Sequence, residues 1–231
     1  MQNTTIEKRI YLSGGGSEKQ SFSLDKFFFD AIPKNGKFLY VPIALRGHKL
    51  YPTAHIWMRS VVDLHDRKDV TFETMDDPSK YSHADLSAFS GIYIGGGNTW
   101  GLIKEFKESG FSKVLIDYHN NGGVVYGGSA GAIILGKRID THDDQNKVGV
   151  TDMSGFDVLN GYSIACHFKG EQEERFKLWS KEKALPIICL AEETGIMISG
   201  STLCCKGALP CVVYYPDSSI KHIAPDESMS L

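Results

Sequence analysis

The 231-residue sequence has little of what special classes of protein require. Its five cysteines are an odd number without a C-x-x-C pair, which predicts neither a disulfide framework nor a zinc or thioredoxin-type site. Because 25 Lys and Arg face 28 Asp and Glu, no basic excess is available for binding nucleic acid. Residues 1–9 are polar and the next apolar run stops at Gly14, so we predict no signal peptide, no membrane contact and a cytoplasmic location.

Nucleotide-binding signatures are missing as well. Neither G-x-G-x-x-G nor Gly-Lys-Ser/Thr occurs, and these are the turns that hold dinucleotides and the phosphates of ATP. We therefore expect no organic cofactor and no metal.

What is present is an ordinary globular composition, with 42% hydrophobic and 23% charged residues. Short apolar runs alternate with helical patterns in the first half, which predicts a mainly parallel sheet flanked by helices on both faces, within one α/β domain spanning 1–231. Residues 140–160 lack periodicity and predict a long loop. Antiparallel strands are expected near the C-terminus. The expected strands are 9–12, 37–44, 70–74, 91–94, 123–126, 187–190, 196–198 and 211–215, and the expected helices are 21–31, 48–65, 99–109, 112–120, 130–135 and 171–184.

The strongest chemical signal is the segment GVVYGGSAGAIILG at 123–136. A buried strand ends in Gly-Gly-Ser-Ala-Gly and a helix begins at once, which is the setting of a G-x-S-x-G nucleophile turn. Small neighbours allow the strained backbone that such a turn needs, and the Ala130 N–H is well placed to donate to an oxyanion. The alternative is a Gly-rich turn that packs closely or holds a phosphate. The strand–turn–helix context favours Ser129 as a nucleophile.

A nucleophilic serine needs a base. Among the eight histidines, His167 follows a short apolar stretch, SIACHF, and precedes a helix, so a strand end could bring it to Ser129. His142 in the polar loop is the second candidate.

A carboxylate usually orients such a base. Asp143 and Asp144 lie in the polar loop, whereas Glu192 and Glu193 follow the apolar run ICLA. A carboxylate just after a strand is well placed at the edge of the site, and all four residues stay candidates at this point.

Two further glycine clusters follow predicted strands. The run IYIGGGN leaves backbone N–H groups approachable, so Gly96 or Gly97 is a candidate second donor to the oxyanion, with a phosphate-binding loop as the alternative. The SGGGS run at 13–17 is interpreted as a turn at the rim of the site, of unknown role.

Taken together, four segments resemble the dipeptidase E and cyanophycinase family of serine peptidases. The segments are IYIGGGNTWGL, VVYGGSAGAIILGK, the stretch ending in CHF, and LAEETGIMI. The resemblance implies a fold similar to the class I glutamine amidotransferases, a flavodoxin-like three-layer sandwich, with Ser in place of their nucleophilic Cys. It implies a peptidase acting on small peptides through an acyl-enzyme. Carried over by motif, it assigns the nucleophile to Ser129, the base to His167, the orienting carboxylate to Glu192 or alternatively Asp144, and the oxyanion donors to Gly97 and Ala130.

One position departs from the family pattern. Dipeptidase E has an Arg shortly after its His that pairs with an Asp side chain of the substrate, and the matching residue here is Glu173. A Glu would repel that side chain, which argues against strict Asp-X specificity. Arg175 lies about 200° away around the helix. Gly96, Asn98 and Glu173 are the expected substrate-binding residues.

Other functions stay open at this point. The same machinery would serve an isopeptide or β-aspartyl amide hydrolase, and a non-catalytic binding or regulatory relative could keep the fold. The expected partner is a small peptide, and a homodimer is an open alternative.

Overall fold

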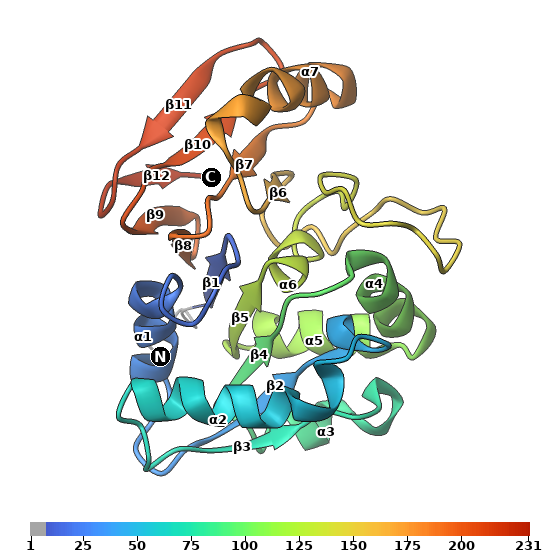
Figure 1. Cartoon of the computed structure of the whole chain (residues 1–231), viewed down its shortest axis with the longest axis vertical. Coiled ribbons are helices and arrows are strands. Elements are labelled where there is room, and N and C mark those ends of the chain that lie inside the picture. Colours follow the sequence, from blue (N-terminus) through green and yellow to red (C-terminus); the bar gives the residue numbers. More distant parts are fainter. Residues whose placement is uncertain (1–7) are drawn as a thin grey trace, which may run out of the picture.

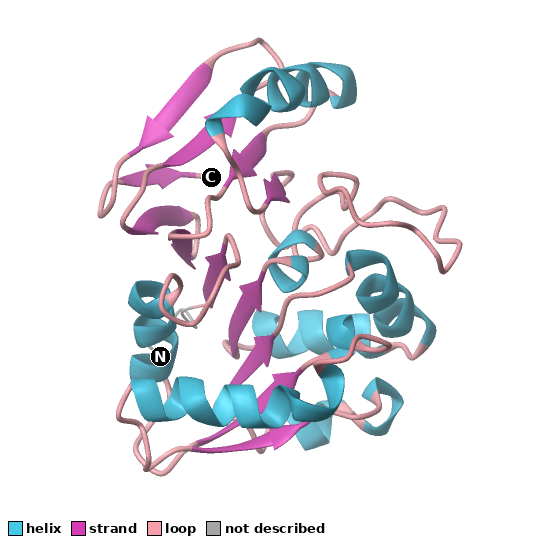
Figure 2. Ribbon diagram, viewed as in Figure 1, coloured by secondary structure: helices cyan, strands magenta, loops and turns pink. Residues whose placement is uncertain are grey.

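The computed structural model describes residues 8–231, so the interpretation of residues 1–7 lies outside it. Two sheets and seven α-helices make up the described chain (Figures 1 and 2). The helices are α1 (Phe22–Ala31), α2 (Ala54–Leu64), α3 (His83–Leu86), α4 (Thr99–Glu108), α5 (Phe111–Asn120), α6 (Ala130–Ile133) and α7 (Glu173–Lys183). The strands are β1 (Arg9–Ser13), β2 (Lys37–Val41), β3 (Thr71–Thr74), β4 (Gly91–Ile94), β5 (Val124–Gly128), β6 (Ser163–Ala165), β7 (Ile187–Cys189), β8 (Thr194–Ser199), β9 (Thr202–Gly207), β10 (Cys211–Tyr214), β11 (Ile220–Ile223) and β12 (Ser228–Ser230).

The larger sheet has the order β12-β9-β8-β1-β5-β4-β2-β3. Its five strands from β1 to β3 in that order run parallel, whereas β8, β9 and β12 are antiparallel to their neighbours. Read from its parallel edge, the order is β3-β2-β4-β5-β1. This matches the 2-1-3-4-5 order of flavodoxin-like folds if β2 is counted as the first strand and β1 as the fifth. The predicted α/β fold with antiparallel strands near the C-terminus is confirmed.

Alternation along the parallel strands produces two covered faces, because successive side chains point to opposite sides of a strand. One face is aromatic and packs against α1 and α2. The other face is aliphatic and packs against α4, α5 and α6, as expected for a three-layer arrangement. The aromatic face is formed by Tyr11, Phe38, Tyr40, Tyr93 and Tyr126.

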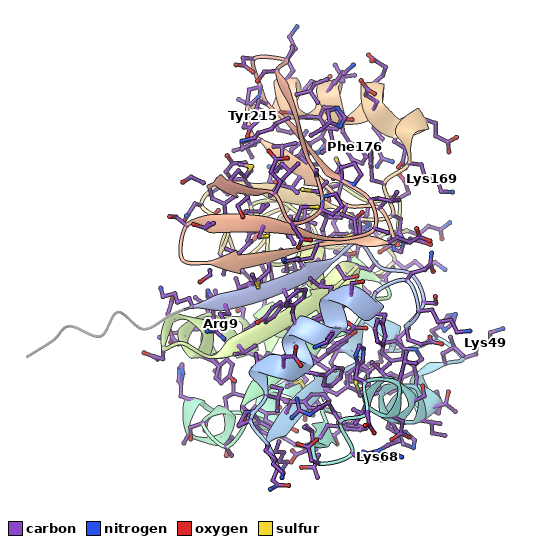
Figure 3. All side chains as sticks on the ribbon, turned by 90° about the vertical axis from the view of Figure 1, so that its left-hand side faces the viewer. Arg9, Lys49, Lys68, Lys169, Phe176 and Tyr215 are labelled. Atoms are coloured by element: carbon purple, nitrogen blue, oxygen red, sulfur yellow. The ribbon has the colours of Figure 1, made fainter. Side chains whose placement is uncertain are left out.

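A second sheet, of order β11-β10-β7-β6, lies beyond the antiparallel edge of the first. Helix α7 covers one of its faces through its residues Phe176 and Trp179, and Phe176 is labelled in Figure 3. Ile188 and Val213 of the same sheet belong to the main core on its other side. Strands β6 and β7 are parallel, so their carboxyl ends meet at one edge.

Several boundaries differ from the sequence expectations. The helix expected over 48–65 is a 3₁₀ turn at Tyr51–Thr53 followed by α2, and the strand expected over 37–44 stops at Val41, because Pro42 has no N–H to donate to a neighbouring strand. Strands β9, β11 and β12 were not predicted, and β6 was expected only as a strand end before His167. Strands β6 and β12 have three residues each, and β11 is largely exposed and shows no alternation. The irregular segment 140–160 is confirmed.

None of the helices within residues 8–231 is both long enough and apolar enough to cross a lipid bilayer.

Asp25 of α1 is a fully buried carboxylate on the aromatic side of the main sheet. Its Oδ2 accepts a hydrogen bond from Ser21 Oγ at 2.7 Å, and its Oδ1 accepts one from Tyr93 at 3.3 Å. Burial disfavours the charged form and raises the pKa of Asp25 from 3.8 to about 6, although these hydrogen bonds oppose the shift. Between about pH 4 and 6, the Asp25 carboxyl is therefore largely protonated in the folded protein and ionised in the unfolded chain.

Because that pKa is raised on folding, Asp25 costs stability as the pH rises from 4 to 7. We expect Asp25→Asn to remove this pH-dependent cost. Between pH 4 and pH 7, the free energy of unfolding of the variant should therefore rise by about 2 kcal/mol relative to that of the wild type. Urea unfolding of both proteins at pH 4, 5.5 and 7 measures the difference. Parallel dependences of the two unfolding free energies on pH would contradict the expected charge burial.

Candidate active site

Ser129 lies at a strained turn between β5 and α6. Its backbone has φ 49° and ψ −111°, a left-handed conformation that is unfavourable for a residue with a side chain. Space around the turn is tight, because a β-carbon at Gly127 would lie 2.6 Å from the Gly131 carbonyl oxygen. One at Gly131 would lie 2.5 Å from the Ile94 carbonyl oxygen. The small residues of the motif are thus required by the packing of β4, β5 and α6.

A chain of hydrogen bonds joins Ser129, His167 and Glu192. Ser129 Oγ lies 2.8 Å from His167 Nε2, and His167 Nδ1 lies 2.9 Å from Glu192 Oε1. With the Nδ1 proton donated to the carboxylate, Nε2 of the neutral ring is free to accept the serine proton. The bonds from His167 and Gln20 lower the pKa of Glu192, which keeps its carboxylate ionised.

The two sheets deliver these side chains from different directions. Ser129 follows β5 of the main sheet, whereas His167 and Glu192 follow β6 and β7 of the small sheet. The His167 N–H donates to the Gly14 carbonyl at 2.9 Å, which attaches it to the turn after β1. Gly15 in that turn has φ 97°, and a β-carbon there would lie 2.4 Å from His167 Cε1. The glycine therefore leaves room for the imidazole ring.

The predicted oxyanion donors lie beside Ser129. Gly96 is so close that a β-carbon on it would be 3.0 Å from Ser129 Cβ, and Gly96 and Gly97 line the same cavity as the serine. Ala130 is the first residue of α6. Within residues 8–231, the N–H groups of Gly97 and Ala130 donate to no other group. Unpaired N–H groups next to a nucleophile are what a developing oxyanion requires.

The cavity in front of Ser129 has a volume of about 520 Å³. The turns after β1, β4 and β5 form one side of it, with Trp57, Tyr93 and Tyr126. The loop residues 141–144 and Arg175 of α7 form the other side. Across residues 8–231, His, Cys, Asp and Glu side chains form no group of three suited to hold a metal ion.

The model of peptidase family S51 matches residues 10–205. The chain belongs to this family. The predicted family is therefore confirmed, and the site lies within the matched residues.

Individual members of the family are more distant. The chain is 30% identical over 109 residues to Peptidase E of Escherichia coli (strain K12 / DH10B) and of Shigella boydii serotype 18, which is 46% of this chain and 46% of each relative. It thus spans about half the length of the curated relatives it matches. A crystal structure of a peptidase from an acI-B1 Actinobacterium has a TM-score of 0.70 at 18% identity, covering 97% of both chains. A Listeria monocytogenes EGD-e structure that carries the peptidase E name has a TM-score of 0.68 at 21% identity, covering 87% of this chain and 99% of that one. These two likenesses confirm the fold.

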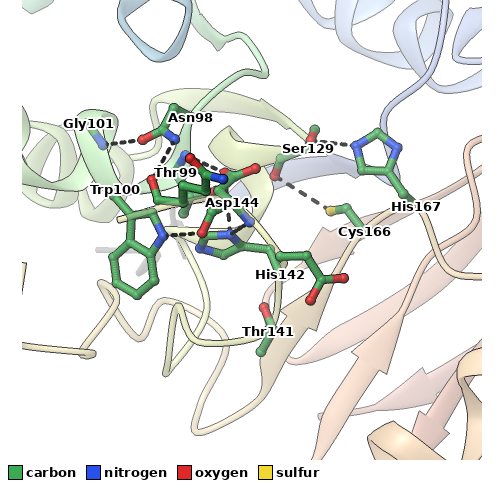
Figure 4. A network of polar contacts seen from close by, with 12 residues as sticks. Asn98, Thr99, Trp100, Gly101, Ser129, Thr141, His142, Asp144, Cys166 and His167 are labelled. Atoms are coloured by element: carbon green, nitrogen blue, oxygen red, sulfur yellow. Dashed lines mark hydrogen bonds and ion pairs between the residues drawn. The ribbon is translucent and has the colours of Figure 1, made fainter. Parts of the chain in front are cut away.

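In this S51 member, Asp144 does not contact His167. Its Oδ2 accepts the Thr99 N–H at 2.8 Å at the start of α4, and its carbonyl accepts Trp100 Nε1 at 2.9 Å. Figure 4 shows this cluster apart from the Ser129–His167 pair. Of the two carboxylates weighed from the sequence, the structure brings Glu192 to the histidine. Asp144 instead holds the loop 140–160 against α4.

His142, the second candidate base, does not contact Ser129 either. Its Nδ1 accepts the Asp144 N–H at 3.0 Å, and its buried Nε2 has no hydrogen-bond partner among the described residues. The ring packs against Trp100 with 5.0 Å between centroids, and burial lowers the pKa of His142. The lowered pKa favours the neutral ring, and the ring lies at the cavity without reaching Ser129.

Two of the expected substrate-binding residues lie elsewhere. Glu173 does not line the cavity, because its carboxylate pairs with Lys177 Nζ at 2.6 Å. The side chain of Asn98 begins α4 by accepting the Gly101 N–H at 2.9 Å. Arg175, on the other side of α7 from Glu173, lines the cavity and pairs with Asp143 Oδ2 at 2.7 Å. The structure therefore brings Arg175, and not Glu173, to the cavity.

Gln20 was not identified from the sequence. Its Nε2 donates to Glu192 Oε2 at 3.0 Å, across 172 residues of chain. The only local signal is its position three residues after the SGGGS turn, and nothing in the sequence connects that turn with Glu192.

The contact between Gly15 and His167 leads to a test. We expect Gly15→Ala to displace the imidazole and to slow covalent labelling of Ser129 by a fluorophosphonate at least tenfold, because the base would no longer reach the serine. Labelling rates of purified proteins measure this. Gly170→Ala is the matched control, since a β-carbon there meets nothing within 4 Å. Equal rates for Gly15→Ala and the wild type would show that His167 does not activate Ser129.

Proposed function

We propose that the protein is a serine peptidase that hydrolyses small peptides through an acyl-enzyme on Ser129. The observation that carries the proposal is the unbroken hydrogen-bond series from Ser129 through His167 to Glu192, which opens into the cavity. Membership of a peptidase family supports the same reaction class.

In the proposed reaction, His167 Nε2 takes the proton of Ser129 as Oγ attacks the carbonyl carbon of the scissile amide. The N–H groups of Gly97 and Ala130 stabilise the oxyanion that forms. His167 then gives its proton to the leaving nitrogen, and the amine departs. Water attacks the ester by the same route and releases the acid and free Ser129. Glu192 keeps the Nδ1–H tautomer in place and stabilises the imidazolium.

The size and charge of the cavity support a small substrate. A volume of about 520 Å³ is in the range that accommodates small molecules rather than a folded protein surface. Arg175 is the only Lys or Arg among the described residues that line it, and Asp143 already pairs with this guanidinium. An acidic substrate side chain would have to displace Asp143, so we propose a specificity that is not restricted to Asp-X.

The test is release of amino groups from a panel of Asp-X, Glu-X, Lys-X, Arg-X, neutral and β-aspartyl dipeptides by the wild type and Ser129→Ala. We expect the wild type to cleave at least one class and the variant to cleave none, because Ser129 forms the covalent bond. Cleavage restricted to β-aspartyl peptides would reassign the protein as an isopeptide hydrolase. A wild type that cleaves nothing and resists fluorophosphonate would be a binding protein, contrary to the proposal.

A pair of variants separates the two carboxylates. We expect Glu192→Gln to lower kcat by about 10²- to 10⁴-fold, because an amide neither stabilises the imidazolium nor enforces the tautomer. Asp144→Asn keeps a carbonyl oxygen for the Thr99 N–H and should stay within about tenfold of the wild type. Steady-state kinetics on the best panel substrate measure both. The reverse order of effects would assign the orienting role to Asp144.

A further inference from the structure

The turn between β1 and α1, residues 13–20, contacts all three proposed catalytic residues. The Ser13 carbonyl accepts the Ser129 N–H at 3.1 Å, and the Gly14 carbonyl accepts the His167 N–H at 2.9 Å. The third contact is made by a side chain, that of Gln20, and it reaches the carboxylate of Glu192.

We propose that Gln20 is a positioning residue for catalysis, which holds the Glu192 carboxylate in the orientation that His167 requires. This role rests on the proposed function, since it acts on the Ser129–His167–Glu192 series. Gln20 does not line the cavity, so its effect reaches the substrate only through Glu192.

The side-chain amide of Gln20 is itself held in place by Ser17. Its Oε1 accepts the backbone N–H of Ser17 and the Ser17 hydroxyl, each at 3.0 Å. Because both donors lie at the oxygen, the NH₂ group is turned toward Glu192. The Gln20 N–H also donates to the Ser17 carbonyl at 3.0 Å, so the turn fixes both the backbone and the side chain.

The two oxygens of Glu192 therefore have one donor each. His167 Nδ1 is 2.9 Å from Oε1 and Gln20 Nε2 is 3.0 Å from Oε2. A glutamate has three rotatable bonds and Glu192 is 42% exposed, so a single bond from His167 would leave the carboxylate free to rotate into solvent. The second donor removes that freedom and favours the ionised form.

Packing supports a site built for this contact. Gly16 has φ 95°, and a β-carbon there would lie 2.9 Å from Gln20 Oε1 and 3.0 Å from Glu192 Cβ. Any side chain at this position would enter the space between the turn and Glu192. The SGGGS run thus has a definite role: it lets the turn approach both the imidazole and the carboxylate.

Two substitutions of Gln20 test the proposal. Gln20→Met keeps the length of the side chain and removes both its N–H donors and the oxygen that accepts from Ser17. We expect kcat to fall about tenfold with KM within about twofold, because a bond to a charged group is lost and no substrate contact changes. Gln20→Glu places a second carboxylate against Glu192. It should raise the midpoint of the acidic limb of the Ser129 labelling rate by about half a pH unit or more, since added negative charge stabilises the imidazolium.

The matched control is Lys19→Ala, which changes an exposed side chain of the same turn and should behave as the wild type. Fluorophosphonate labelling is the primary readout, because it reports Ser129 activation without a known substrate. Gln20→Met labelling at the wild-type rate would overturn the proposal. So would a loss of stability in both Gln20 variants with an unmoved pH midpoint, which indicates a purely structural role.

A failure of the proposed function looks different. If the wild type itself were neither labelled by the fluorophosphonate nor able to cleave any dipeptide, the hydrolase would be refuted. A labelled, active wild type that Gln20→Met matches in every parameter would refute only the role of Gln20.

Discussion

The structure of the site depends on the backbone of the turn after β1. Gly14 donates its N–H to the Thr194 carbonyl at 2.9 Å and accepts the His167 N–H at the same distance, while Ser13 accepts the Ser129 N–H. Because β1 lies between β5 and β8 in the main sheet, this turn can contact the end of β5 on one side and the small sheet on the other. These bonds are made by the backbone alone, but the turn can form them only with glycine at its centre, because a β-carbon at Gly14 would lie 2.0 Å from the Ala191 carbonyl oxygen.

That junction explains how Ser129 and His167, the proposed nucleophile and base, can meet although they come from different sheets. The main sheet supplies Ser129 on the strained turn after β5, together with the N–H groups of Ala130 and, from the turn after β4, Gly97. The small sheet supplies His167 and Glu192 from adjacent parallel strand ends. The interval from β6 to β7 is filled by α7, and this crossover also carries Arg175 to the cavity. One βαβ unit therefore carries His167, Glu192 and a residue that lines the cavity.

Much of this candidate site could be predicted because its residues lie in short local sequence motifs. A strand, a Gly-Gly-Ser-Ala-Gly turn and a helix together point to Ser129, and short apolar runs before His167 and Glu192 place both at strand ends. The parallel core was predictable for the same reason. The second sheet was not, since β6 has only three residues and β11 is largely exposed and shows no alternation. Gln20 and the orientation of α7 are likewise set by long-range packing, which spacing along the sequence does not encode.

The loop 140–160 shows how a polar segment can be ordered without regular structure. Asp144 and Trp100 hold it against the start of α4, and the buried neutral ring of His142 packs between them. This arrangement brings Asp143 to Arg175 at the cavity wall. The negative charge of Asp143 balances the positive charge of Arg175, the one Lys or Arg among the lining residues of the described chain. An Asp144 engaged in this way is not available to a base. Glu192 is the carboxylate that lies at hydrogen-bond distance from His167, and its second oxygen accepts the bond from Gln20. The loop 140–160 thus binds Asp144 away from His167, and the turn that carries Gln20 contacts Glu192.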